Sequence, residues 1–382
     1  MIYRKFFTLA IPIMLQQLIS LSVSFVDVLM LSRLGSEAIA AGGICNQIYF
    51  VFFALAMGIG GGMGVFMAQY WGKKDIEGIR KVLGMTLVCV LISFGFLMVI
   101  VFCLSKPLMI GISGGEDAQV IEMGVDYLRL VLFAYIFGAV TTCYSFALRS
   151  IGKPQPALYL SIFSVLCNIL LNYILIFGKM GFPALGISGA AIATSVSKFL
   201  EMLLMIVYIY GFDKVLNGSK KQLLNFDGLL FKKFIQITIP VVMNDVMWSI
   251  CMVLYSSAYS RVSTDAMAAV QVTNSIVNMF ISVPVSLCSA ASVIVGNMIG
   301  GAKIKESIEN SRKYLRLSLL FGMVVGFLLF ISQPLVFYCF TIEAELSSMV
   351  KSLLLIHSIC MPIRSVCIML LSGILRGGGD TT

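Results

Sequence analysis

Charged residues are scarce in this chain, and their scarcity excludes most water-soluble folds. Only 12% of the 382 residues are Asp, Glu, Lys or Arg, whereas 59% are apolar. A soluble globular domain usually carries about 25% charged residues. We therefore expect the lipid bilayer to be the solvent and first partner of this chain.

Histidine and paired cysteines are also lacking, which excludes several kinds of site. The chain has one His, and its ten Cys residues are scattered singly with no Cys-x-x-Cys pair. Structural zinc sites and disulfide frameworks need such clusters. The sequence offers no Ser/His/Asp set either, so we expect no metal site, no catalytic residues, no cofactor and no enzymatic activity.

A net charge of +9 would suit nucleic acid, but the basic residues are distributed by loop rather than gathered in a patch with aromatic residues. We therefore expect no nucleic-acid partner. Lys73, Lys74 and Lys303 fall in loops on one side of the membrane, whereas Glu116 and Glu343 fall on the other. The positive-inside rule then predicts a multi-pass protein of the cell (inner or plasma) membrane with a cytoplasmic amino terminus.

Long apolar runs fill the sequence, and each can cross about 30 Å of hydrocarbon as a helix. The predicted fold class is an all-α integral membrane protein with about ten transmembrane helices. The expected spans are 8–33, 39–69, 82–104, 119–148, 155–177, 186–210, 234–259, 266–298, 314–339 and 348–373.

The chain contains an internal repeat with an offset of 228 positions, which falls by one residue in its later part. The matching pairs include Pro12 and Pro240, Arg33 and Arg261, Asn46 and Asn274, Gly72 and Gly300, Pro107 and Pro334, and Arg149 and Arg376. A collinear series of this kind over about 140 residues indicates two related halves.

The offset covers six predicted helices, an even number, so both copies start on the same side of the membrane. This predicts two parallel six-helix lobes related by an axis along the membrane normal. We expect a first lobe at 1–210, a cytoplasmic linker at 211–233 and a second lobe at 234–382. The second lobe shows four helices instead of six, so we expect the sequence to be a truncated form of a longer chain; the alternative is a genuine ten-helix protein.

Several motifs occur in an order and spacing that is specific in combination. They are Val26-Asp27, Ser32-Arg33-Leu34-Gly35, Ala68-Gln69-Tyr70-Trp71-Gly72, Asn168-x-x-x-Asn172 and the run from Gly186 to Thr194. With these motifs the chain resembles the multidrug and toxic compound extrusion (MATE) family, within the multidrug, oligosaccharidyl-lipid and polysaccharide (MOP) exporter superfamily. The resemblance implies a transporter, and members of this family usually have twelve transmembrane helices.

Asp27 lies in the first predicted span. A carboxylate in hydrocarbon must face a wet cavity, find a cation or be protonated, and each of these would suit a proton- or sodium-coupling residue. Alternatively, it snorkels to the outer interface or is satisfied by a neighbouring helix. The resemblance favours coupling, because similar transporters carry an acidic coupling residue at this position.

Asn168 and Asn172 share one helix face and can complete a polar cluster with Asp27. We group Thr194 with them as a cation-coupling candidate. Related sequences often carry Asp in place of Asn172, so this chain lacks one titratable group there. The alternative is that the two amides only hold helices together.

In the second half, Asn244, Asp245 and Trp248 follow Pro240 in the seventh span. We predict that they line a second-lobe or substrate cavity, where Trp248 would stack on a flat organic cation. An interface-anchoring role for Trp248 is the alternative.

Two further patterns have mainly structural interpretations. Lys198 and Glu201 are oppositely charged residues three positions apart, a spacing typical of a self-compensated ion pair. Gly58 and Gly62 form a small-x-x-x-small pair, which predicts close helix packing.

These features favour an ion-coupled antiporter that exports small organic, mainly cationic compounds by alternating access of its two lobes. Its coupling ion would be a proton or Na⁺, and we expect a monomer. The alternative is a flippase for lipid-linked oligosaccharides from the same superfamily, although such a cavity should carry several Lys or Arg residues. A membrane-embedded enzyme or a channel fits the sequence less well.

Overall fold

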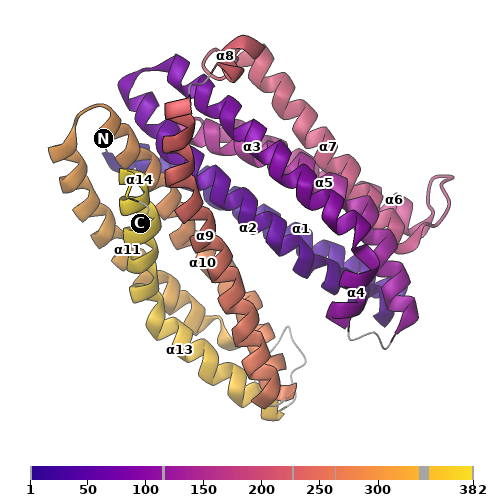
Figure 1. Cartoon of the computed structure of the whole chain (residues 1–382). Helices are drawn as coiled ribbons and strands as arrows, with labels where there is room; N and C mark the ends of the chain where they lie inside the picture. Colours follow the sequence, from indigo (N-terminus) through magenta and orange to yellow (C-terminus); the bar gives the residue numbers. More distant parts are fainter. Residues whose placement is uncertain (1, 114–116, 226–227, 263, 335–343, 381–382) are drawn as a thin grey trace. The chain divides into compact units, whose positions relative to one another are not determined.

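The computed structural model describes residues 2–113, 117–225, 228–262, 264–334 and 344–380. Over these ranges it contains helices and no strands (Figure 1). The elements are α1 Ile2–Leu31, η1 Ser32–Leu34, α2 Ser36–Lys73, α3 Ile76–Cys103, α4 Ser105–Ser113, α5 Ala118–Ser150, α6 Gln155–Phe177, α7 Gly186–Phe212, α8 Lys220–Leu224, α9 Gly228–Val262, α10 Thr264–Gly300, α11 Ile304–Ile331, α13 Ala344–Ile368, the π-helix η2 Met369–Leu375 and α14 Arg376–Gly378.

Within the described ranges, ten helical stretches are long and apolar enough to cross a membrane. This confirms the predicted fold class and number of spans. Glu116 and Glu343, which supported the predicted membrane orientation, lie outside the described residues. Two short helices, α4 and α8, fall in segments where the apolar runs predicted loops.

Packing divides the chain into two compact units. The amino-terminal unit comprises Ile19–Met67 and Asp75–Val246, and the carboxyl-terminal unit comprises Met1–Leu18, Ala68–Lys74 and Met247–Thr382. These units are defined by contacts rather than by the repeat. The division into lobes at residues 210 and 234 therefore stays a prediction.

Each unit includes the first part of a helix that comes from the opposite half of the sequence. The carboxyl-terminal unit includes α1 up to Leu18, and the amino-terminal unit includes α9 up to Val246. The two boundaries are equivalent in the repeat, since 246 minus 18 is 228. The exchange of helix segments therefore follows the internal symmetry of the chain.

The glycines of α2 allow this exchange in the amino-terminal unit. A Cβ atom on Gly58 would collide with Val242 of α9, and one on Gly62 would collide with Thr238. The absence of side chains lets the two backbones approach closely, which confirms the predicted packing role of this pair.

Phe6 of α1 belongs to the core of the carboxyl-terminal unit. Its ring stacks on Tyr314 of α11 with centroids 4.8 Å apart, and both side chains are fully buried. In the same unit α11 packs on α13, where Ser318 and Ser365 each donate a hydrogen bond to the other's backbone carbonyl at 2.9 Å. These hydrogen bonds satisfy hydroxyl groups that would be costly to bury in a membrane without a partner.

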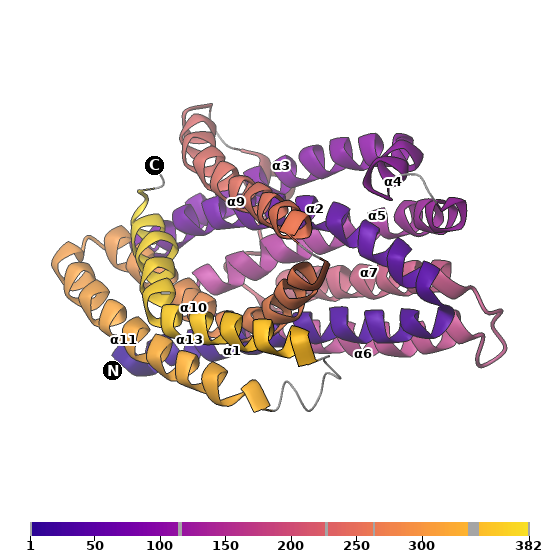
Figure 2. The same cartoon turned by 90° about the horizontal axis from the view of Figure 1, so that it is seen from below.

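The helices that carry the candidate site lie in the amino-terminal unit. There α7 packs against both α5 and α6, and in Figure 2 it runs between them. α6 ends at Gly178, whose φ of 65° is the left-handed conformation that glycine adopts readily. The chain then reverses into α7, so that the polar faces of α6 and α7 meet.

The segment after α7 is held on the same unit by α3. Arg80 donates hydrogen bonds to the backbone carbonyls of Val215 and Lys214, both at 2.9 Å. Gly84 lies against the backbone of Leu223 in α8, where a Cβ atom would collide with the Leu223 carbonyl. This part of the predicted linker is therefore docked on α3.

Candidate functional site

Asp27 is the acidic end of a hydrogen-bonded cluster in the amino-terminal unit. The residue is half-buried near the end of α1, and its Oδ1 accepts a hydrogen bond from Asn172 Nδ2 at 2.6 Å. Asn172, in α6, is fully buried. A short bond from a buried amide holds the carboxylate at one position on this helix face.

The other predicted coupling residues continue the cluster. Asn172 Nδ2 also donates to Asn168 Oδ1 at 3.1 Å, and Asn168 Nδ2 donates to Thr194 Oγ1 at 3.3 Å. The structure thus brings together Asp27, Asn168, Asn172 and Thr194, from α1, α6 and α7. Their grouping was predicted from the sequence, whereas their role in coupling stays a prediction.

One atom of this cluster lacks a hydrogen-bond partner. The side-chain oxygen of Asn172 is buried, and no described residue donates to it. A buried carbonyl oxygen without a donor is costly in a membrane. Together with the Asp27 carboxylate, this oxygen gives the cluster two oxygen acceptors of the kind that hard cations prefer.

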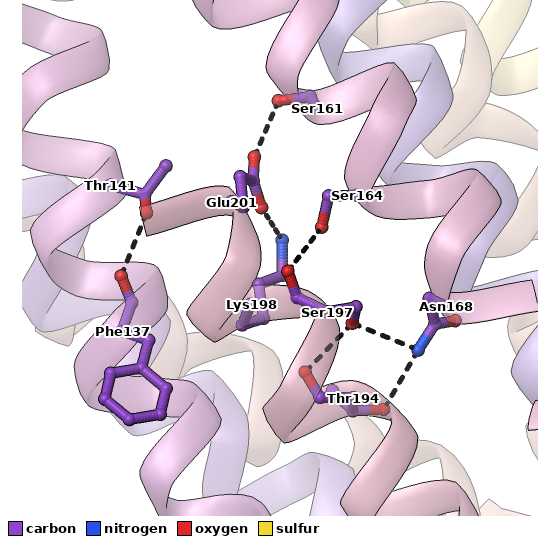
Figure 3. A network of polar contacts seen from close by, with 9 residues as sticks. All are labelled: Phe137, Thr141, Ser161, Ser164, Asn168, Thr194, Ser197, Lys198 and Glu201. Carbon is purple, nitrogen blue, oxygen red and sulfur yellow. Dashed lines mark hydrogen bonds and ion pairs between the residues drawn. The ribbon is translucent and has the colours of Figure 1, made fainter. Parts of the chain in front are cut away.

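A second group of polar residues extends along the contact of α6 and α7 (Figure 3). Asn168 Nδ2 also approaches Ser197 Oγ at 3.5 Å, and Ser164 Oγ donates to the Ser197 carbonyl at 3.3 Å. Further along, Glu201 accepts hydrogen bonds from Ser161 at 3.0 Å and from Lys198 at 2.8 Å. The Lys198–Glu201 pair predicted from its spacing is therefore confirmed.

The serines of this contact were not singled out from the sequence, although a signal for them exists. Ser161, Ser164, Asn168 and Asn172 recur at intervals of three or four residues along α6. Such spacing places polar side chains on one helix face. Thr194, Ser197 and Glu201 form the same pattern on α7, so two polar faces of apolar helices could have been matched to each other.

The second-half candidates lie close to one another in α9, at the boundary between the two units. Asn244 is exposed and Asp245 half-buried near the end of the α9 segment in the amino-terminal unit. Trp248, with 55% of its surface exposed, belongs to the carboxyl-terminal unit. The three residues thus fall on both sides of the unit boundary within α9, and their predicted cavity role stays a prediction.

No three His, Cys, Asp or Glu side chains gather as a possible metal site in the part of the chain that the structure describes. The charged group in the middle of the amino-terminal unit is instead the set of Asp27, Lys198 and Glu201. The charge of Lys198 acts through space on Asp27.

The family model MatE matches residues 12–174 and again residues 240–382. The two matches start 228 positions apart, which is the offset of the internal repeat. The chain is 26% identical over 361 residues to the probable multidrug resistance protein YoeA of Bacillus subtilis (strain 168), covering 93% of this chain and 77% of that protein. It is 29% identical over 305 residues to the probable multidrug resistance protein NorM of Bradyrhizobium diazoefficiens, covering 76% of this chain and 62% of NorM.

Solved structures agree on the fold. An outward-facing conformation of a multidrug resistance MATE family transporter of the MOP superfamily matches with a TM-score of 0.89 at 20% identity, covering 99% of this chain and 83% of that one. A MOP superfamily transporter from Pyrococcus furiosus, described as having a binding pocket of reverse polarity, matches with a TM-score of 0.87 at 21% identity over the same shares. Since the MatE model matches more than half of the sequence, the chain belongs to the MatE family of membrane transporters and is not an enzyme.

Proposed function

We propose that this protein is an ion-coupled antiporter that exports small organic compounds, cationic ones among them, from the cell. Relatives named as multidrug resistance proteins support the substrate class. The observation that carries the proposal is the 2.6 Å hydrogen bond from Asn172 to Asp27, together with the buried Asn172 oxygen, which has no donor among the described residues. The proposed coupling ion, a proton or Na⁺, binds at this place.

Ion binding at Asp27 changes the charge of the site by one unit. Once Asp27 is protonated or bound to Na⁺, its bond from Asn172 loses the assistance of a full negative charge, and bonds to charged groups are about twice as strong as neutral ones. The preferred position of α1 against α6 then changes. If two arrangements of the lobes differ in free energy by only a few kcal/mol, this loss of hydrogen-bond strength shifts the balance between them.

α1 provides a covalent route for this effect. Its residues up to Leu18 belong to the carboxyl-terminal unit, whereas the part that carries Asp27 belongs to the amino-terminal unit. A change in position at Asp27 therefore acts on a helix that both units share. We propose that this coupling drives alternating access in a monomer of the plasma membrane with a cytoplasmic amino terminus.

The test is transport by the purified protein in lipid vesicles. The vesicles are loaded with a fluorescent organic cation, and a proton gradient or a sodium gradient is imposed separately. We expect one of the two gradients to drive movement of the cation against its own gradient. Cation movement that is indifferent to both gradients would contradict an ion-coupled antiporter.

A further inference from the structure

The segment that follows α7 carries a cluster of cations around one guanidinium group. Arg80 of α3 donates from Nη2 to the backbone carbonyl of Lys214 at 2.9 Å and from Nη1 to Oε1 of Gln222 at 3.1 Å. Gln222 directly follows Lys221 in α8. Lys214 and Lys221, whose side chains are both exposed, are therefore held near Arg80.

The positive charge of this cluster is not neutralised within the described part of the chain. Arg80 donates there to uncharged oxygens, two backbone carbonyls and one amide. Among the acids close in sequence, Asp213 and Glu77 each form an ion pair with another lysine, and Asp75 caps α3. Because a guanidinium has five N–H donors and Arg80 uses three of them, the cluster keeps donors for an anionic ligand.

Several contacts fix the backbone that carries the two lysines. Asp213 accepts from the amides of Val215 and Leu216, both at 2.8 Å. Ser219 and Gln222 form a capping box at the start of α8, which packs on α3 beside the end of α7 (Figure 1). A fixed backbone loses less freedom when a ligand binds, so this arrangement favours binding of a ligand.

The cluster lies at the depth of the lipid headgroups. α3 has 28 residues and is about 42 Å long at 1.5 Å per residue, whereas the hydrocarbon core is about 30 Å thick. The first turns of α3, which include Arg80, therefore extend into the headgroup layer. α7 ends at Phe212, immediately before the segment that Arg80 binds.

Exposed apolar side chains flank the cations. Phe212 is 76% exposed and Leu224 is 59% exposed. Segments that lie on a membrane surface combine apolar side chains, which enter the lipid, with lysines, which meet the phosphates. The segment from Phe212 to Leu224 has both kinds of side chain at its surface.

We propose that Arg80, Lys214 and Lys221 bind the phosphate of an anionic phospholipid, with Phe212 and Leu224 against its acyl chains. The lipid phosphate lies at the same depth as the cluster, and Arg and Lys bind phosphate oxygens through charge-assisted hydrogen bonds. This site lies outside the predicted coupling cluster. The inference goes beyond the proposed function and does not rest on it.

The alternative is that the two lysines only add to the positive charge on this side of the membrane. A diffuse attraction of anionic lipids depends on the number of charges near the surface. A binding site depends on the particular lysines that Arg80 holds. The two cases therefore differ in what the removal of other lysines does.

The experiment titrates the detergent-solubilised protein with phosphatidylglycerol and, as a reference without net charge, with phosphatidylcholine, and measures the bound lipid by native mass spectrometry. The parent should bind phosphatidylglycerol roughly a hundredfold more tightly, since each of three cations near a lipid surface contributes a factor of about five. Lys214→Gln/Lys221→Gln should weaken this binding roughly thirtyfold, and Lys214→Arg/Lys221→Arg should keep it.

The matched control is Lys232→Gln/Lys233→Gln, which removes two exposed lysines at the start of α9 and changes the net charge by the same amount. It should leave the binding of phosphatidylglycerol almost unchanged. An equal loss in both Gln variants would show a diffuse attraction and overturn the proposal. A parent that does not prefer phosphatidylglycerol would overturn it as well, even if the Lys214→Gln/Lys221→Gln variant did not fold.

Inorganic phosphate is the second probe, because it offers the same anionic group without acyl chains. At millimolar concentration it should neither displace phosphatidylglycerol from the parent nor raise the melting temperature of the lipid-free protein. Displacement of the lipid by phosphate at this concentration would indicate a site for a soluble anion and would contradict a lipid site.

Discussion

Asn172 donates a 2.6 Å hydrogen bond to Asp27, while its own side-chain oxygen is buried without a donor among the described residues. The amide thus holds the carboxylate with one end and leaves an acceptor at the other. We expect an additional cation or proton to satisfy such an arrangement better than the protein alone does.

Replacing Asp27 by Asn should abolish coupling and preserve folding. Asn keeps the size of the side chain and an oxygen that accepts from Asn172, but it cannot bind or release a proton near neutral pH. We expect gradient-driven export to fall by at least about tenfold, since the charged partner of the hydrogen bond is lost. Efflux from vesicles under the active gradient measures this, with binding of the organic cation to detergent-solubilised protein as a second readout.

The control for that variant is Asp75→Asn, which removes one negative charge outside the cluster. Asp75 caps α3 by accepting from the Gly78 amide at 2.8 Å, and Asn is an equally good cap. Export should be unchanged. Parent-like, ion-dependent export by the Asp27→Asn variant would move the coupling role elsewhere, with Asp245 as the next candidate.

Replacing Asn172 by Asp should make the site more dependent on cations. Two carboxylates within hydrogen-bonding distance repel each other unless a proton or a metal cation lies between them. We expect Na⁺ to raise the melting temperature of this variant by several degrees more than that of the parent. Thermal unfolding in sodium chloride and in choline chloride at equal ionic strength measures the difference, and an equal response of both proteins would argue against a cation between residues 27 and 172.

Gly84→Ala should destabilise the docking of α8 on α3. The added methyl group meets the backbone carbonyl of Leu223, which cannot move without displacing the helix. Overpacking of this kind costs about 1–3 kcal/mol. Gly95→Ala in the same helix is the control, because its Cβ would meet no atom within 4 Å. We expect the melting temperature to fall for the first variant and to stay equal or rise for the second.

Asp213→Asn should reduce stability at neutral pH and have less effect in acid. The Asp213 side chain is buried, and burial raises its pKa, but hydrogen bonds from Lys153 and from the amides of Leu216 and Val215 lower the pKa below its ordinary value of 3.8. A depressed pKa means that the carboxylate stabilises the folded state above the unfolded pKa, and that this contribution is lost as pH falls through the folded pKa.

The difference in melting temperature between parent and Asp213→Asn should therefore be largest near pH 7 and shrink below pH 4. At neutral pH the cost should be about 1.5 kcal/mol or more, as for a hydrogen bond to a charged group. Thermal unfolding across this pH range tests the expectation. A difference that does not depend on pH would show that Asp213 acts through its shape and not its charge.

The sequence predicted the number of spans because each is set by a local property, the length of an apolar run, but the limits were less accurate: the span expected at 314–339 is the helix Ile304–Ile331. It also identified Asp27, Asn168 and Asn172, because an acid or a pair of amides in hydrocarbon stands out against its surroundings. Serines do not stand out in this way. Ser161 and Ser164 can satisfy their hydroxyl groups within their own helix, so the partners that they contact depend on which helix packs beside them.

Contacts between distant segments were beyond the reach of these patterns. Nothing local in residues 213–224 indicates that Arg80 holds their backbone or that Gly84 makes room for them. The glycine spacing in α2 predicted a close helix neighbour but not that α9 would supply it. Periodicity shows which face is buried, and the identity of the covering helix follows from the whole chain.

The reciprocal placement of the first segments of α1 and α9 has a consequence for biosynthesis. While the ribosome is still translating the first half, the glycine face of α2 at Gly58 and Gly62 has no Thr238 or Val242 to cover it. The amino-terminal unit therefore stays incomplete after α1 to α8 have emerged, and Tyr314, the partner of Phe6 in the other unit, is synthesised later still. Such incomplete intermediates expose surface to misassembly, so we expect either half, when produced alone, to be degraded and the two halves to rescue each other when produced together.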